Sequence, residues 1–270
     1  MKILITGISG TVGSLLAPEL ARDHDVHGID LRPSDWPNFT QADLCDPDAL
    51  PPVFEGMDVV LHLAADPRHE VEIGWEELTN PNLIATARMY DAAHDAGVRR
   101  VIFVSSMHTM GGYEFDEPYA SIVSGRLNGL DPASIPLVTG DAPARPDSRY
   151  GATKIFGESL GRYYTEGGNI DRPDERPMEV ICIRLGTLPR SNRPEKDYRS
   201  LVSWFSKRDA IGFFRACVEQ PGISYEIIYG ASNNTWKIYD TPYAYNLLNF
   251  VPADDALEHW GKDEQEDSQC

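Results

Sequence analysis

Short apolar runs alternate with longer amphipathic segments through the first two-thirds of the chain. The apolar runs predict strands at residues 2–6, 25–31, 57–64, 100–105 and 178–185. Apolar residues at helical spacing predict helices at residues 10–22, 82–96 and 148–164. The repeated strand–helix–strand order is typical of an α/β fold, in which helices cover both faces of a doubly wound parallel sheet.

Two segments interrupt this alternation. Residues 111–149 are rich in proline, glycine and aspartate and follow a strand end, which is where open parallel sheets place their ligand sites. Residues 165–177 are charged and predict a surface excursion. Beyond residue 186 the pattern loosens and predicts a helix at 209–219 and a strand at 224–229. We therefore expect a core at residues 1–185 with an insertion at 111–149, a smaller region at 186–262 and a polar tail at 263–270.

Composition excludes several classes of protein. The chain has 270 residues, 41% of them hydrophobic, so it can bury a sizeable core. Its net charge of −18 is opposite to that of a nucleic-acid-binding surface. No segment approaches the roughly 18 apolar residues of a membrane span, and the apolar run before Gly7 is too short for the core of a signal peptide. We expect a cytoplasmic protein without nucleic-acid or membrane partners, and the cysteine spacing indicates no metal site.

Three glycines follow the first predicted strand. Gly7, Gly10 and Gly13 have GxxGxxG spacing at the start of the first predicted helix. Such glycines allow a tight turn and a close approach of the backbone to a pyrophosphate, whose charge meets the N–H groups of the helix start. Asp30 ends the second predicted strand, where a carboxylate accepts hydrogen bonds from an adenosine ribose and repels a 2′-phosphate. This favours NAD over NADP, a preference that the nearby Arg32 weakens slightly.

A second signal comes from a tyrosine and a lysine. Tyr150 and Lys154 are four residues apart on a predicted helix, so they share one helical face. A nearby ammonium stabilises a phenolate and lowers the pKa of the tyrosine toward that of a working general base. Ser105 and Ser106 follow the apolar run that ends at Val104, and a hydroxyl there can orient a substrate oxygen while the phenolate removes its proton.

These motifs occur in an order that resembles the extended short-chain dehydrogenase/reductase superfamily, in its NAD-dependent epimerase/dehydratase group. The resemblance runs from about residue 2 to residue 257 and is closest to uronate dehydrogenases and related NAD-dependent sugar-1-dehydrogenases. The local similarities are His62-Leu63-Ala64-Ala65, Ser105-Ser106-Met107-His108-Thr109, Ala144-Arg145-Pro146-Asp147, the run from Tyr150 to Glu158, Arg184-Leu185-Gly186, Ser203-Trp204-Phe205-Ser206 and Tyr229-Gly230-Ala231-Ser232. It implies a Rossmann-type sheet with a small C-terminal substrate-binding region, NAD as cofactor, and a homo-oligomer.

The resemblance also implies roles for individual residues. Ser106 aligns with the catalytic hydroxyl, Tyr150 with the base and Lys154 with its partner on the nicotinamide ribose. The implied cofactor-binding residues are Gly7, Gly10, Thr11, Val12, Gly13, Asp30, Leu31, Arg32, Asp43, Leu44, Leu63, Ala64, Ala65, Asn82, Tyr150, Lys154 and Ile183. The implied substrate-binding residues are Ser106, Met107, His108, Tyr150, Arg184 and Arg68, with Arg184 matching the arginine that grips a uronate carboxylate.

The sequence departs from the uronate dehydrogenases at two places. Met107 replaces the asparagine that follows their paired serines, which removes a polar contact to the sugar. Residues 65–69 (Ala-Asp-Pro-Arg-His) are more similar to the halophile-type glucose-6-phosphate dehydrogenases of the family. Arg68 and His69 are therefore candidates for binding a phosphate or another anion.

The leading hypothesis is an NAD-dependent dehydrogenase that oxidises the anomeric C1 of a free aldose derivative to its lactone, with Tyr150 as the general base. A uronate or a sugar phosphate is the favoured substrate, and the sequence leaves open which sugar is used. One alternative is a nucleotide-sugar epimerase or dehydratase, although dehydratases place acidic residues where this chain has Met107 and His108. A remoter alternative is a non-catalytic NAD-sensing regulator. Asn233 and Asn234 lie near the expected site mouth without an assigned role.

Overall fold

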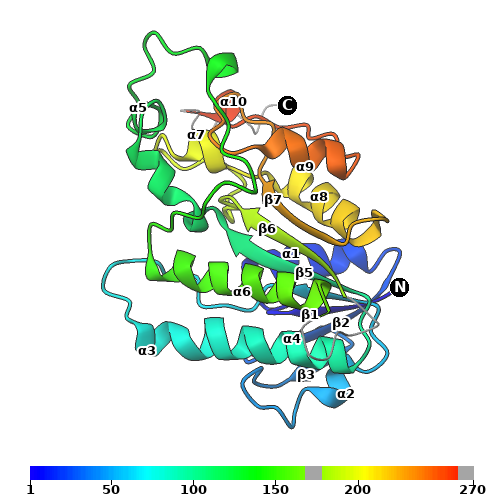
Figure 1. Ribbon diagram of the computed structural model, residues 1–270. Helices are drawn as coiled ribbons and strands as arrows, with labels where there is room; N and C mark the ends of the chain where they lie inside the picture. Colours follow the sequence, from blue (N-terminus) through cyan, green and yellow to red (C-terminus); the bar gives the residue numbers. More distant parts are fainter. Residues whose placement is uncertain (168–177, 261–270) are drawn as a thin grey trace.

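The computed structural model describes residues 1–167 and 178–260 and contains one parallel sheet (Figure 1). Its strands are β1 (Lys2–Thr6), β2 (Asp25–Asp30), β3 (Phe39–Gln41), β4 (Val59–His62), β5 (Arg100–Ser106), β6 (Glu179–Leu185) and β7 (Tyr225–Gly230). They are arranged in the order β3-β2-β1-β4-β5-β6-β7. The chain thus runs outward from β1 to β3 and returns to place β4 beside β1. That reversal opens a crevice at the carboxyl ends of β1 and β4, where such sheets bind ligands.

The principal helices of the described residues form two layers, one on each face of the sheet. They are α1 (Thr11–Leu20), α2 (Pro51–Phe54), α3 (Trp75–Leu78), α4 (Ala85–Asp95), α6 (Arg149–Thr165), α8 (Lys207–Glu219) and α9 (Thr241–Leu247). Helices α1, α8 and α9 contribute buried residues to the core on one face, whereas α2 and α4 contribute to the core on the other. Figure 1 shows α6 beside α4, and the two helices are in contact.

Strand β5 shows why the sheet needs both layers. All seven of its residues are buried, and neighbouring side chains enter opposite cores. Ile102 and Val104 join the core beneath α1 and α8, and Val101 and Phe103 join the one beneath α4. Because side chains alternate along a strand, a continuous apolar run has an apolar surface on both faces and requires a cover on each.

A third apolar cluster lies beyond the carboxyl ends of β5 and β6. It joins the insertion, represented by Met110 and Ile122, to Trp204 and Tyr239 of the C-terminal region. Short helical elements occur here, namely the 3-10 turns at Met107–Thr109, Gly111–Phe115 and Pro132–Ser134 and the helices α5 (Tyr119–Val123), α7 (Ser200–Ser203) and α10 (Ala256–His259). The insertion therefore packs beside the crevice as part of an apolar core.

The structure confirms the predicted α/β class and parallel sheet, with two local differences. The helix expected at 82–96 starts earlier, because α3 continues through a π-helical turn at Thr79–Ile84. Pro81 lies in this turn and has no N–H to donate, which favours the widened ladder. The short strand β3 was not predicted, since it has only three residues and its side chains are largely exposed.

Strand β7 arises from the C-terminal region and completes the sheet beside β6. The domain boundary expected at residue 185 stays a prediction, and so does the surface excursion at residues 165–177. Most of that excursion and the polar tail at residues 263–270 lie outside the described residues. Within the described part of the chain, no helix is both long enough and apolar enough to cross a membrane.

Candidate active site

A cavity of about 780 Å³ opens at the carboxyl ends of β1, β4 and β5. It brings together the glycine loop, Asp30, Ser106, Tyr150 and Lys154, which are far apart in the sequence. The predicted cofactor-binding residues line it except Asn82 and Ile183. Lining residues that sequence reasoning did not assign are Ile29, Ala42, Asp66, Pro67, Pro81, Ala85, Val104, Ser105, Leu185, Gly186 and Arg190.

The glycine loop is shaped to hold a phosphate group. Gly7 adopts φ +73°, and a Cβ there would lie 2.7 Å from the backbone nitrogen of Ala64. A Cβ on Gly13 would lie 2.6 Å from the Gly7 oxygen, so glycine is needed for α1 to pack this closely on the turn. The first turn of α1 contains no acidic residue, and its N-cap Gly10 provides no capping side chain. Its N–H groups are therefore available to an anion, which fits the pyrophosphate of a dinucleotide.

Asp30 lies at the end of β2 beside this loop. One carboxylate oxygen accepts a hydrogen bond from the Ser9 backbone at 3.0 Å, and the other accepts one from the Arg32 backbone at 3.0 Å. Each oxygen has a further lone pair to accept a ribose hydroxyl. The carboxylate is held rigidly at the cavity wall, so the residues present fit the adenosine ribose of NAD.

A buried histidine fixes the ends of β1 and β4 around the loop. The Nδ1 atom of His62 is 2.8 Å from the Thr6 hydroxyl, which accepts a hydrogen bond from the Ala64 backbone at 3.3 Å. Burial lowers the pKa of His62 to about 3, with a smaller contribution from the charge of Lys154. His62 is therefore neutral, and it acts as a hydrogen-bonding spacer between the two strands.

Ser106 and Tyr150 meet where β5 ends and α6 begins. Ser148 caps α6, accepting a hydrogen bond from the Gly151 backbone at 3.1 Å, and this places Tyr150 in the first turn. Burial raises the pKa of Tyr150 to about 12, while its hydrogen bond with Ser106 acts in the opposite direction. A Cβ on Gly151 would lie 2.3 Å from the His108 carbonyl oxygen, so this glycine allows the helix start to touch the strand end.

Lys154 lies one turn further along α6, and its side chain is buried. Its ammonium donates a hydrogen bond to the Val104 carbonyl at 2.8 Å and lies 5.7 Å from the centre of the Tyr150 ring. Burial lowers the pKa of Lys154 to about 8, although the charge of Glu158 raises it. The sequence predicted that Lys154 lowers the pKa of Tyr150, but burial has the larger effect. It destabilises both the phenolate of Tyr150 and the ammonium of Lys154.

Arg184 has a different environment from the one expected of a substrate anchor. Its guanidinium donates two hydrogen bonds to Glu158, at 3.0 and 2.9 Å, and others to Gly140 O and Tyr229 Oη, both at 3.1 Å. Its side chain is only 3% exposed, and it does not line the cavity. Ser105 donates to the same carboxylate at 2.6 Å. The structure therefore places Arg184 in a buried ion pair that joins α6 to β6.

Another arginine lies at the Tyr150 end of the site. His108 packs edge-on against the Tyr150 ring at 5.9 Å, and its Nδ1 atom is 2.8 Å from the Asp147 carboxylate. Arg199 donates to that carboxylate at 3.3 Å, and a 2.9 Å ion pair joins it to Glu114. Its side chain is 32% exposed. The sequence analysis assigned no role to Asp147 or Arg199. Both lie far in sequence from His108, the one member of this polar cluster that was predicted as a site residue.

The remaining predicted substrate residues are not brought to the cavity. Met107 is buried in the third apolar cluster, so its thioether faces neighbouring side chains. Arg68 donates three hydrogen bonds to Asp66, and it is Asp66 that lines the cavity. The His69 ring lies 4.2 Å from the His108 ring, next to the polar cluster.

Two predicted cofactor-binding residues, Asn82 and Ile183, do not line the cavity. Asn82, buried within the π-helical turn, holds both backbone groups of Asp66 and donates to Thr153 of α6 at 3.2 Å. Asn82 thus holds Asp66 at the cavity wall. Ile183 belongs to the core beneath α8. Within residues 1–167 and 178–260, no group of three His, Cys, Asp or Glu side chains could hold a metal ion.

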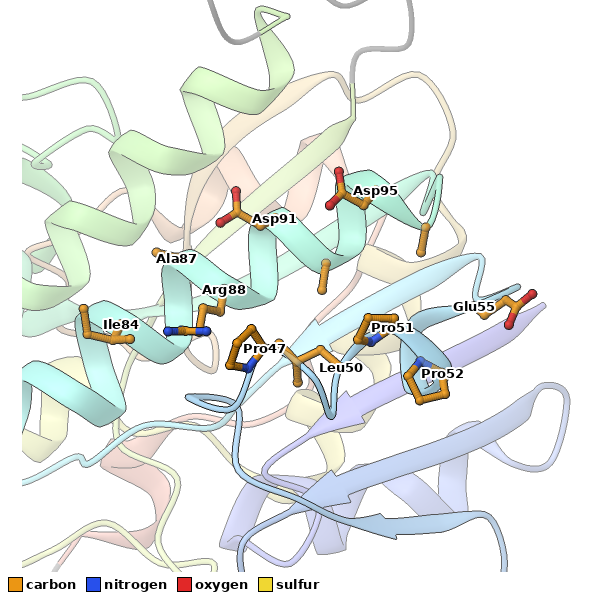
Figure 2. A pocket seen from close by; sticks show the side chains of 12 residues that line it. Pro47, Leu50, Pro51, Pro52, Glu55, Ile84, Ala87, Arg88, Asp91 and Asp95 are labelled. Carbon is orange, nitrogen blue, oxygen red and sulfur yellow. The ribbon is translucent and has the colours of Figure 1, made fainter.

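A second pocket of about 750 Å³ lies between α2 and α4, away from these residues (Figure 2). Its lining consists of Pro47, Leu50, Pro51, Pro52, Glu55, Ile84, Ala87, Arg88, Asp91, Ala92, Asp95 and Ala96. The lining combines prolines and apolar side chains with four charged ones, Glu55, Arg88, Asp91 and Asp95, and has no hydroxyl, imidazole or thiol group. We assign no chemistry to this pocket.

Comparisons with known proteins agree with this geometry. The model of the NAD dependent epimerase/dehydratase family matches residues 3–209. The chain is 32% identical to the NAD-dependent glucose-6-phosphate dehydrogenase of Haloferax volcanii, over 95% of this chain and 94% of that protein. It is 33% identical to the L-arabinose 1-dehydrogenase (NAD(P)(+)) of the same organism, over 92% and 88%. The structure is also similar to a solved one, that of a tyrosine-to-alanine mutant of the Agrobacterium tumefaciens uronate dehydrogenase complexed with NAD. The TM-score is 0.76 at 27% identity, and the alignment covers 98% of this chain and 92% of that chain.

The buried pair leads to a stability prediction. Glu158→Gln would leave the guanidinium of Arg184 buried opposite a neutral partner, which typically costs about 3–5 kcal/mol. Urea unfolding should show this loss. The matched control is Glu166→Gln on the same helix, which removes an exposed 3.4 Å pair with Arg162 and should cost about 1 kcal/mol or less. Equal losses in the two variants would contradict the structural role of the pair.

Proposed function

Because the chain belongs to the NAD dependent epimerase/dehydratase family, we propose that it oxidises the C1 hydroxyl of a free aldose derivative to a lactone, with NAD as the hydride acceptor. The observation that carries this proposal is that Ser106, Tyr150 and Lys154 line the same cavity as the glycine loop and Asp30. Relatives named as glucose-6-phosphate and arabinose dehydrogenases support a sugar substrate oxidised at C1.

Proton removal falls to Tyr150. Its Oη takes the proton of the C1 hydroxyl while the C1 hydride leaves for NAD, so the C1–O bond becomes the carbonyl of the lactone. Ser106 orients the reacting oxygen, because its own oxygen is held by a hydrogen bond from the His108 backbone at 3.2 Å and its hydroxyl lies beside Tyr150. Such positioned proton transfer typically contributes about 10²–10⁴-fold to a rate.

The remaining lining residues hold the cofactor, which supplies the hydride acceptor when bound. The glycine loop would hold the pyrophosphate and Asp30 the adenosine ribose. Lys154 would contact the nicotinamide ribose, since its ammonium lies at the cavity wall beside Tyr150. The nearby negative charge of Asp30 disfavours the additional phosphate of NADP.

The polar cluster beyond Tyr150 would hold the rest of the sugar. We assign to Arg199 the anchoring role that the sequence suggested for Arg184, since Arg199 is partly exposed and linked through Asp147 to His108. Asp147 keeps the Nδ1 side of His108 occupied, which leaves Nε2 for a sugar hydroxyl. Glu114 and Asp147 offset the charge of Arg199, so neutral sugars remain candidates beside uronates and sugar phosphates.

Three broader features are also part of the proposal. Residues 1–185 would hold the cofactor, and residues 186–262 would complete the sugar end. We place the enzyme in the cytoplasm, where NAD is used and thiols stay reduced; Cys45, Cys182 and Cys217 are free. A homo-oligomer is expected from the family resemblance.

The first test is Tyr150→Phe. Removing the phenol oxygen leaves the ring packing intact but deletes the proton acceptor, so sugar-dependent NADH formation should fall by about 10²-fold or more. NAD affinity, measured by calorimetry, should change little. Wild-type turnover in this variant would overturn the assignment of the base.

The second test is the pH profile. The competent pair has a phenolate at Tyr150 and an ammonium at Lys154, one proton fewer than the fully protonated pair. With pKa values of about 12 and about 8, the pair holds that number of protons between about pH 8 and about pH 12. At saturating NAD, kcat/KM should therefore rise about tenfold per pH unit below pH 8 and level off above it. A profile that is flat from about pH 6 to about pH 8, which are the two pH units below the pKa of Lys154, would contradict the coupling of the two groups.

The third test identifies the sugar. NADH formation would be followed with galacturonate, glucuronate, glucose 6-phosphate, glucose, galactose and arabinose. Arg199→Ala should lower kcat/KM on the preferred anionic sugar by about tenfold or more, because a charge-assisted hydrogen bond contributes about 1.5–3 kcal/mol. Arg126→Ala, on an exposed pair with Glu117, is the matched control. An equal loss on neutral and anionic sugars would assign Arg199 to packing of the site.

A further inference from the structure

We propose that Arg190 is a cofactor-binding residue whose guanidinium binds the pyrophosphate of NAD beside the glycine loop. The inference rests on the proposed function only in its use of NAD, and it does not depend on which sugar is oxidised. Arg190 lies in the connection between β6 and α7, and no sequence motif indicated a role for it.

The side chain of Arg190 reaches across the cavity. Arg190 lines the same cavity as the glycine loop, and its Nε atom donates a hydrogen bond to the Thr11 hydroxyl at 3.1 Å. Thr11 is the first residue of α1, directly after the N-cap Gly10. The guanidinium therefore lies beside the N–H groups that would hold the pyrophosphate, so the anion would meet donors from both walls.

The backbone that carries Arg190 is held in place by several hydrogen bonds. The Asn192 backbone donates to the Pro189 carbonyl at 3.0 Å, closing a turn in which Asn192 adopts φ +60°. Lys207, at the start of α8, donates its backbone N–H to the Asn192 side chain at 2.7 Å and its ammonium to the Arg190 carbonyl at 2.8 Å. The fold thus fixes the position from which the Arg190 side chain extends.

The charge of Arg190 is available, in contrast to that of the other arginines near the site. Arg184 is paired with Glu158, Arg199 with Glu114, and Arg68 with Asp66. No carboxylate among the described residues forms an ion pair with Arg190. Since only its Nε donor is used by Thr11, the terminal nitrogens remain free to bind phosphate oxygens, a geometry that suits a guanidinium better than an ammonium.

A cation is also needed at this point on electrostatic grounds. The chain has a net charge of −18, and Asp30 and Asp66 both line the cavity. These carboxylates oppose the entry of a pyrophosphate, whereas the partial positive charge at the start of α1 favours it. Arg190 adds a full positive charge next to this helix start.

Binding of cofactor fragments to Arg190→Ala tests this directly. Adenosine diphosphate ribose contains the pyrophosphate but no nicotinamide, so its affinity can be measured by calorimetry without turnover. We expect Kd for ADP-ribose and for NAD to rise about tenfold or more, as for the loss of one charge-assisted contact. Adenosine has no phosphate, and its Kd should stay within about twofold of the wild-type value. Arg190→Lys keeps the charge and should recover part of the loss.

Arg22→Ala is the matched control, because it removes one positive charge from an exposed pair with Glu19 near the opposite end of α1. It should leave all three affinities unchanged. The proposal is wrong if Arg190→Ala binds ADP-ribose as tightly as the wild type does, or if adenosine loses affinity by the same factor as ADP-ribose. Failure of the proposed function would look different, since the wild type would then bind ADP-ribose normally yet oxidise none of the sugars.

Discussion

The buried ion pair of Glu158 and Arg184 joins α6 and β5, which carry the proposed reacting groups, to β6. Glu158 lies one helical turn after Lys154 on α6, Arg184 lies on β6, and Ser105 donates to the same carboxylate from β5. Two buried charges are costly unless each has enough hydrogen-bond partners. Here Glu158 accepts hydrogen bonds from Arg184 and Ser105, and the remaining donors of Arg184 bind Gly140 O and Tyr229 Oη. The pair therefore fixes how α6 sits on the sheet, and with it the distance from Tyr150 to Ser106.

The same burial sets the chemistry of the tyrosine. A cavity wall that excludes water raises the pKa of Tyr150 and lowers that of Lys154, so each group disfavours its own charged form. Proton transfer between the two costs less than either ionisation alone, because it creates opposite charges side by side. In the proposed mechanism, Tyr150 and Lys154 therefore act as a proton-transfer pair for a substrate hydroxyl held by Tyr150 and Ser106.

Two kinds of arginine surround this site. Arg184 has its donors taken by partners within the fold, whereas Arg190 extends from an anchored turn with terminal nitrogens free. Arg199 is intermediate, since it is shared between two carboxylates and is partly exposed. The division follows from position: an arginine inside a strand is buried between neighbouring strands and helices, but one in a connection beyond the strand ends can reach a ligand.

The sequence by itself determined the parallel sheet and the cofactor, and it predicted the principal reacting groups. The local patterns are the continuous apolar runs of the strands, the glycine spacing before α1, Asp30 at a strand end, and Tyr150 four residues before Lys154. Their geometry follows from strand and helix periodicity. Tertiary structure alone decided which arginine is buried and which is exposed. It also joined His108 to Asp147 and Arg199, and Arg190 to Thr11. Such contacts depend on how distant segments pack, because a charged side chain takes its role from the partners and the solvent that surround it.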